Sequence, residues 1–365
     1  MEMPGKIYST ACSQEWFHCM PYPEINNRSG FQFQHLFFMD EAGRPLLTTI
    51  VKATFTIQKN GKLLLAEEQT QVNLAGEYWG APDASSYKYE PETAFFKPAT
   101  DVILIGHAWA PHTHVAELAV TLRIGSIQKM MMVFGHRYWI KSLGTIAATQ
   151  PLPFEKIPLI AEHAFGGWDR SHADIAKHTF EPRNPVGVGF HAKHGSFQEG
   201  MPLPNLEYFS ERIRHFHDAP APALFGYVSP HWQPRAGLGG TYDSAWQEER
   251  MPLLPTDFDK RYFCGAPQDQ IVTGYLKGHE PVMVVNATKN SPLQFDLPGM
   301  PAPECVIGVQ GLEDQSLRTV LDTVIINCDE MRLNLIWRAS MNLPKGFEDV
   351  VSIQIHSGSW LNTNL

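Results

Sequence analysis

The sequence predicts a mainly β fold, a β-rich α+β protein with antiparallel sheets or sandwiches at both ends and a long irregular segment between them. β-branched and aromatic residues alternate between turn signals in both end regions, whereas glycine and proline are dense in the middle. We therefore divide the chain into β-rich residues 1–148, an irregular segment 149–268 with short helices, and β-rich residues 269–365. These parts form one compact unit or two intimately packed β subdomains.

The N-terminal part contains the clearest hairpin signal. Residues 48–58 alternate as a strand does, and Asn60-Gly61 is a residue pair typical of a tight turn into Leu63–Leu65. The same alternation predicts further strands at Val102–Ala108, Val115–Ile124 and Lys129–Ile140.

Two short helices are predicted in the irregular segment. One begins near Asn205, because Leu206, Phe209, Ile213 and Phe216 follow at helical spacing. The other follows Asp243, with Ser244 and Gln247 at capping-box spacing and Pro252 at its end. Asp257 and Asp259 are expected to cap the turn that they flank. Strands return at Glu280–Ala287, Thr319–Asn327, Met331–Ala339 and Val350–Ile355.

The composition of the chain indicates a globular protein and argues against several kinds of partner. The apolar content of 43% in 365 residues supports a globular core, and the net charge of −9, without long acidic runs, argues against nucleic-acid or anionic-membrane partners. The sequence has no secretory signal and no apolar run of the ~18 residues that a membrane span needs. Its five cysteines form no Cys-x-x-Cys pair, which fits buried thiols in a reducing cytosol. We expect a cytoplasmic protein.

Catalytic patterns are weak. His107, His112 and His114 form the densest histidine cluster and are the residues of an alternative metal site, although solvent-facing histidines at a turn fit the pattern better. The sequence has neither a Gly-x-Ser-x-Gly elbow nor a phosphate-binding loop. We therefore expect no cofactor and no enzyme activity.

Binding is the function that the irregular segment favours. It combines specified Gly, Pro and Asn positions with Trp, Tyr and Arg, the side chains that anchor protein interfaces. The alternative is that these rings build the core beneath the segment. The residues predicted to contact a partner are Phe165, Trp168, Asp169, Asn184, Asn205, Glu207, Trp232, Arg235, Tyr242, Trp246 and Arg250.

An ordered series of motifs extends from Thr48 to Arg338. Its members are 51–55, 97–102, 135–139, 158–159, 162–169, 184–190, 203–207, 232–235, 240–243, Trp246, Arg250, 254–255 and 257–259. Through this series the chain resembles the family numbered 2169 among the domains of unknown function, which is found beside spike and effector genes of bacterial type VI secretion systems.

The resemblance implies a cytoplasmic adaptor, or loading chaperone, of a Gram-negative bacterium. Its partners would be a secreted effector and a spike-tip protein, either the valine-glycine-repeat protein or the Pro-Ala-Ala-Arg-type cone. The family supplies no catalytic residues. Two alternatives stay open: a metal-dependent hydrolase that uses the histidine cluster, and a structural component of the injected spike.

Overall fold

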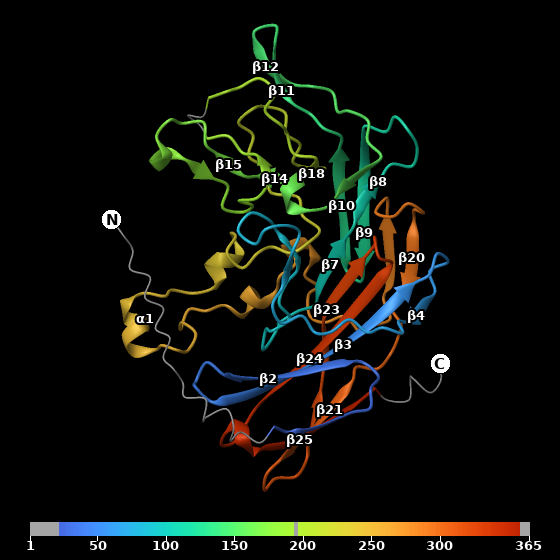
Figure 1. The fold of residues 1–365 in the computed structure, drawn as a ribbon, viewed down its shortest axis with the longest axis vertical. Helices are drawn as coiled ribbons and strands as arrows, with labels where there is room; N and C mark the ends of the chain where they lie inside the picture. Colours follow the sequence, from blue (N-terminus) through green and yellow to red (C-terminus); the bar gives the residue numbers. More distant parts are fainter. Residues whose placement is uncertain (1–21, 193–195, 358–365) are drawn as a thin grey trace.

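The computed structural model describes residues 22–192 and 196–357, and it confirms the mainly β architecture (Figure 1). The largest sheet has six strands in the order β2-β3-β24-β23-β7, with β4 paired to β3. Neighbours are antiparallel except β7 and β23. The strands are β2 (Gln32–Met39), β3 (Pro45–Ile57), β4 (Leu63–Leu65), β7 (Asp101–Ile105), β23 (Val320–Asn327) and β24 (Arg332–Asn342). The predicted Asn60-Gly61 hairpin is confirmed, since it joins β3 to β4.

A five-stranded antiparallel sheet also mixes strands from distant parts of the chain. Its order is β18-β10-β9-β19-β20. The strands are β9 (Glu117–Ile124), β10 (Ile127–Phe134), β18 (Leu206–Tyr208), β19 (Pro281–Val285) and β20 (Leu293–Asp296). This sheet therefore ties the irregular segment, through β18, to both β-rich parts.

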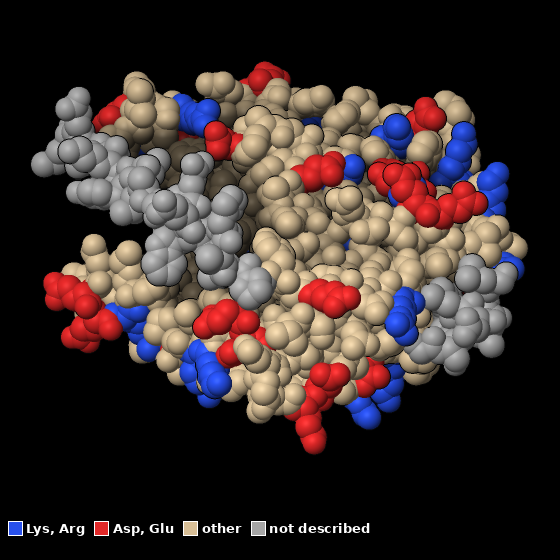
Figure 2. All heavy atoms as spheres, turned by 60° about the horizontal axis from the view of Figure 1, so that its bottom comes forward, with Lys and Arg blue, Asp and Glu red and all other residues tan. Residues whose placement is uncertain are grey.

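A third sheet has four strands in the order β1-β25-β21-β22. They are β1 (Glu24–Asn27), β21 (Glu304–Val309), β22 (Gln315–Arg318) and β25 (Val350–His356). This sheet lies at the bottom of Figure 1, and Figure 2 turns that end forward. Acidic and basic side chains are interspersed on the face seen there, so it presents no large field of one sign.

The remaining elements are short. Two-stranded pairs are formed by β5 (Glu77–Tyr78) with β6 (Tyr87–Tyr89), β8 (His107–Trp109) with β13 (Lys156–Pro158), β11 (Trp139–Ser142) with β12 (Thr145–Ala148), β14 (Phe165–Gly166) with β17 (Val188–Gly189), and β15 (Trp168–Asp169) with β16 (Thr179–Phe180). The helix α1 spans Ser244–Glu249. Single 3₁₀ turns are η2 (Ala161–His163), η3 (Ile175–Lys177), η4 (Arg235–Leu238), η5 (Lys260–Phe263), η6 (Gln268–Gln270) and η7 (Phe347–Asp349).

The six-stranded sheet is buried on both faces. On one face, Val51 and Phe55 of β3 join an apolar cluster that includes Val120 of the five-stranded sheet and Ile353 of the four-stranded sheet. The other face carries buried charges beneath residues 66–100. Its ion pairs include Lys52 with Glu92 at 2.6 Å, Lys97 with Asp101 at 2.7 Å and Arg338 with Asp322 at 2.5 Å. Buried charges need such partners because the loss of hydration is costly.

The helix predicted near Asn205 is wrong. Residues Leu206–Tyr208 form β18, which pairs with the edge strand β10. The apolar spacing that suggested a helix reflects burial instead, since Ile213 and Phe216 pack with Trp139 in a small separate cluster. Tertiary pairing has overridden a local pattern.

The second predicted helix is confirmed as α1, with a different cap. Asp243 is the N-cap, and its carboxylate accepts a hydrogen bond from the Trp246 N–H at 2.9 Å. Ser244 is the first helical residue instead of the cap. The predicted capping by Asp259 is also confirmed, because its side chain accepts from the Arg261 N–H. Within residues 22–192 and 196–357, no helix is long and apolar enough to span a membrane.

Candidate functional site

Most side chains predicted to contact a partner are buried. Seven of the eleven are less than a tenth exposed: Phe165, Asp169, Asn184, Asn205, Glu207, Trp232 and Arg235. A side chain with so little accessible surface does not reach a partner docked on this conformation. For these seven, the structure shows internal contacts, and their predicted role in partner binding stays a prediction.

Asn184 holds together the glycine-rich turn of the irregular segment. Its Nδ2 donates to the carbonyl oxygens of Ala161 at 2.7 Å and Phe165 at 3.1 Å. Gly167 has a φ of +91°, and a Cβ there would lie 2.3 Å from the Gly187 oxygen. Only glycine fits so close a backbone contact with a positive φ.

Asn205 and Asp169 fix two neighbouring loops. Asn205 Nδ2 donates to the Phe134 oxygen at 2.8 Å, and its Oδ1 lies 2.7 Å from Nδ1 of His163. Asp169 accepts from the Ser171 and Ala192 N–H groups, at 2.9 Å and 2.8 Å. Burial acts to raise the pKa of Asp169, but these hydrogen bonds outweigh it and lower that pKa.

Arg235 is the buried anchor of the region. Its Nη1 lies 2.6 Å from Oε1 of Glu90, and the guanidinium donates to the carbonyl oxygens of Val228 and Tyr262, both at 2.7 Å. Burial raises the pKa of Glu90, although the Arg235 charge opposes this. A Cβ at Gly265 would lie 2.1 Å from the Glu90 carboxylate, so this glycine makes room for the pair.

A cavity of about 370 Å³, which we call the Arg235 groove, opens over this anchor. Its walls are mainly apolar, and three arginines border it. The lining residues are Arg183, Tyr208, Ala221, Pro222, Leu224, Val228, Gln233, Pro234, Arg235, Leu238, Arg261, Cys264, Ala266, Pro267, Gln268 and Ile271. Arg183 is held by Glu181 at 2.7 Å and Arg261 by Asp259. The volume lies within the usual range for small-ligand or peptide sites.

Sequence reasoning missed most of this groove. Arg183, Pro222 and Ile271 come from separate parts of the chain, and no local pattern marks them. Glu90 was missed for the same reason, since its partner Arg235 is distant in the sequence. The density of proline in the irregular segment was the one available signal, because prolines supply several wall positions.

Trp168 belongs to an exposed aromatic pair, which we call the Trp168 hairpin. The ring is 46% exposed and stacks on Phe180 of β16 with centroids 4.5 Å apart. The Arg170 guanidinium lies 5.2 Å from the Trp168 ring centroid. This hairpin presents an apolar face edged by a positive charge, a combination common in protein interfaces.

A second exposed aromatic surface surrounds α1. Tyr242 is 56% exposed and meets Trp246 edge-on at 4.7 Å. Trp246 and Arg250 are half-buried and fixed: the Trp246 Nε1 donates to the Leu253 oxygen at 2.8 Å, and Arg250 donates to the Leu254 oxygen at 2.6 Å. In Figure 1, β15 lies at the upper left and α1 at the lower left.

Two of the three histidines of the alternative metal site, His107 and His112, have other partners. His107 Nδ1 lies 2.8 Å from the Asp329 carboxylate, and His112 Nδ1 lies 2.8 Å from the Thr113 oxygen. In the part of the chain that the structure describes, no group of three or more His, Cys, Asp or Glu side chains is placed to hold a metal ion.

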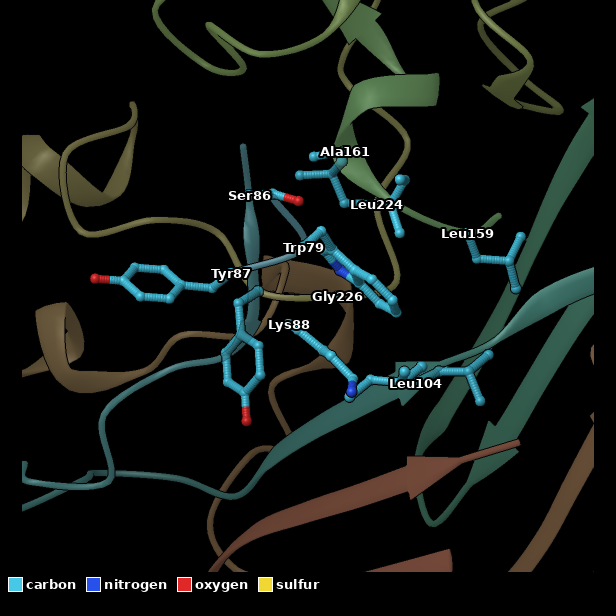
Figure 3. A pocket seen from close by; sticks show the side chains of 12 residues that line it. Trp79, Ser86, Tyr87, Lys88, Leu104, Leu159, Ala161, Leu224 and Gly226 are labelled. Atoms are coloured by element: carbon cyan, nitrogen blue, oxygen red, sulfur yellow. The ribbon is translucent and has the colours of Figure 1, made fainter. Parts of the chain in front are cut away.

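A small hollow lies between the 79–88 hairpin and the β7 strand (Figure 3). Trp79 and Lys88 border it on one side, and Leu159 and Ala161 on the other. Its volume of about 10 Å³ holds about one water molecule, so it is not a substrate site.

A family model described as an uncharacterized protein conserved in bacteria, domain of unknown function 2169, matches residues 42–338. No curated protein and no solved structure matches the chain.

Proposed function

This chain belongs to that bacterial family, and from this premise we propose that it is a cytoplasmic adaptor that binds a type VI secretion effector and helps to load it on the spike tip. The tip component is a valine-glycine-repeat protein or a Pro-Ala-Ala-Arg-type cone. One observation carries the proposal beyond family resemblance. The irregular segment is held rigidly by its buried polar residues, and it presents Trp168 and Tyr242 outward.

Rigid presentation favours binding. The buried hydrogen bonds of Asn184 and Asn205 fix the loops from which the Trp168 hairpin projects. A preorganised aromatic surface loses little conformational entropy on association, so more of the contact energy appears as affinity. The Arg235 groove offers an apolar channel for an extended segment of the same partner. An adaptor needs no chemical step, only a surface that shields apolar parts of its cargo until assembly.

Co-purification tests this function. The full chain carrying an affinity tag is produced with the effector and tip proteins encoded by adjacent genes, and bound partners are identified by mass spectrometry. We expect one of them to be retained. Replacing an aromatic anchor typically costs at least about 2 kcal/mol, so Trp168→Ser should weaken retention about 30-fold. Leu312→Ser is the matched control, because Leu312 is 53% exposed and lies in the β21–β22 turn.

Several results would contradict the proposal. If the wild-type chain retains none of these proteins, it is not their adaptor. If the Trp168→Ser variant retains its partner as well as the wild type does, the chain does not load an effector through this surface. Recovery of the chain in secreted material after firing indicates a structural spike component. Stoichiometric zinc that is lost on replacing His112 or His114 indicates a metal-dependent hydrolase.

A further inference from the structure

A second cavity, of about 480 Å³, lies apart from the aromatic surfaces, and we call it the Lys59 pocket. Its lining residues come from five loops or strand ends: Lys59, His107, Trp109, Lys156, Thr288, Lys289, Asn290, Leu293, Cys328, Asp329 and Met331. In Figure 1 the strands that border it, β4, β8 and β20, lie at the right, whereas β15 and α1 lie at the left. The pocket and the aromatic surfaces therefore occupy opposite sides of the protein.

The fold fixes the backbone segments that carry the lysines of this pocket. Lys59 belongs to the β3–β4 turn, which packs closely on β20, since a Cβ at Gly61 would lie 2.0 Å from the Gln294 oxygen. Lys156 of β13 is paired with Trp109 of β8. The Trp109 N–H in turn donates to the Asn286 oxygen at 2.9 Å, which brings the Lys289 turn alongside.

The pocket has an excess of positive charge in a chain whose net charge is −9. Three lysines line it against one carboxylate, Asp329, and that carboxylate already contacts His107 at 2.8 Å. Lys156 and Lys289 Nζ lie 5.3 Å and 6.0 Å from the centroid of the Trp109 ring. Among the described residues, none of the three lysines forms an ion pair with a carboxylate. These ammonium groups are available to an anion.

Beside the lysines, Thr288 adds a hydroxyl that is unpartnered among residues 22–192 and 196–357. Its side chain is 6% exposed, and it lines the pocket. Its Oγ1 is buried and has no hydrogen-bond partner in the described part of the chain. Buried hydroxyls in proteins are nearly always satisfied, and those that are not call for an explanation. If a carboxylate oxygen enters the pocket beside Thr288, this hydroxyl is a donor that can hydrogen-bond to it.

We infer that the Lys59 pocket docks an acidic segment of a protein partner, with Asp or Glu carboxylates placed between the lysines. The lysines stand on three separate segments, two turns and strand β13, around a volume much larger than one phosphate, which suits several carboxylates spaced along a chain. The Trp109 ring supplies an apolar wall for the neighbouring side chains. This inference rests on the proposed adaptor function and assigns a chemistry to one of its partner contacts.

The position of the pocket has a consequence for assembly. One partner that wraps around the protein, or two partners held together, can occupy the pocket and the Trp168 hairpin at once. Two linked contacts raise the effective concentration at the second site and strengthen the complex without new contacts. An acidic segment also accelerates the encounter, because opposite charges steer association at low salt.

The test measures peptide binding to the full chain by calorimetry at low salt. The probes are a hexaglutamate peptide, a hexaglutamine peptide and inorganic pyrophosphate. We expect hexaglutamate to bind and hexaglutamine not to bind. The double variant Lys156→Gln/Lys289→Gln should weaken hexaglutamate binding at least about tenfold. The control Lys177→Gln/Lys345→Gln, which removes two exposed lysines elsewhere, should leave it unchanged.

Thr288→Val keeps the shape of the side chain and removes the hydroxyl. It should weaken hexaglutamate binding severalfold while the thermal midpoint of the free protein stays the same or rises. Equal binding by the two double variants would overturn the inference. So would tighter binding of pyrophosphate than of hexaglutamate, which would reassign the pocket to a phosphate ligand.

The inference and the proposed function fail in different ways. Suppose that the wild-type chain does not bind hexaglutamate, and that the Lys156→Gln/Lys289→Gln variant retains a neighbour-encoded protein as well as the wild type does. Then only the pocket assignment is wrong. If hexaglutamate binds as expected and no neighbour-encoded protein is retained, the adaptor function fails and the inference, which rests on it, fails as an account of partner docking.

Discussion

Arg137 donates from Nη2 to the Glu207 carboxylate and to the Pro204 carbonyl oxygen, the latter at 2.7 Å. Both side chains are buried, and the guanidinium also lies 4.2 Å from the centroid of the Phe134 ring. The pair joins the segment that follows β10 to strand β18. Two sequence motifs, 135–139 and 203–207, therefore meet in one ion pair. Glu207 was predicted as a partner contact, and its role here is internal.

Breaking this pair should destabilise the protein strongly. Arg137→Met leaves the Glu207 carboxylate buried without its closest charged partner, with the Ile213 N–H at 3.2 Å and Arg212 at 3.4 Å as its remaining contacts. Removal of one partner of a buried ion pair costs about 3–5 kcal/mol. Urea denaturation followed by tryptophan fluorescence measures the free energy of unfolding. Arg318→Met is the control, because Arg318 is exposed and should change that energy by less than about 0.5 kcal/mol. Similar values for both variants would refute the structural role.

The glycine turn gives a second prediction. Gly167→Ala forces a Cβ to within 2.3 Å of the Gly187 oxygen at a φ of +91°. We expect a loss of at least about 2 kcal/mol in the free energy of unfolding, from strain and displaced backbone. Gly226→Ala is the matched control, since a Cβ there meets nothing within 4 Å. If both variants unfold at the same urea concentration, the turn is not the rigid support that we describe.

The strands could be predicted from the sequence and the sheets could not. The residue pattern identified β3, β9 and β23 because each has buried residues at every second position or along most of its length. The partner of each strand in a sheet could not be predicted in this way. β7 lies parallel to β23, and no local pattern encodes a partner so distant in the sequence.

The sequence singled out the irregular segment, but it could not tell which of that segment's side chains are exposed. Trp232 and Tyr242 belong to the same motif-rich segment, yet one is 6% exposed and the other 56%. Residue type favours interfaces and cores alike, so the sequence could not separate them. The Lys59 pocket left no sequence signal, because its lysines are single residues on three separate turns or strands.

The cysteines give a third prediction. Burial raises the pKa of Cys264 to about 12 and that of Cys305 to about 11, and it also raises the pKa of Cys328. Cys12 and Cys19 lie outside the described residues, so the test uses a Cys12→Ser/Cys19→Ser variant. At about pH 8 its native thiols should react with Ellman's reagent on the order of a hundredfold more slowly than in denaturant. Rapid labelling of the folded protein would contradict their burial.

Lys129 gives the last prediction, a dependence of stability on pH. Burial lowers the pKa of Lys129 to about 8, although the Asp269 carboxylate, 2.7 Å from Nζ, opposes the shift. In the unfolded chain the same amine keeps its proton up to about pH 10.4. Between these two values the unfolded state binds more protons, so the free energy of unfolding rises with pH, by at most about 1.4 kcal/mol per unit from this one group.

The variant Lys129→Met isolates this contribution, because every other group titrates alike in both proteins. Urea denaturation at about pH 7 and about pH 9 gives the stability of each protein. The wild type should gain about 1 kcal/mol over Lys129→Met between the two conditions. Lys345→Met, at an exposed lysine, should track the wild type at both. A wild-type advantage that is constant with pH would mean that Lys129 keeps its charge, held by Asp269 and the Leu224 carbonyl oxygen more strongly than its burial opposes it.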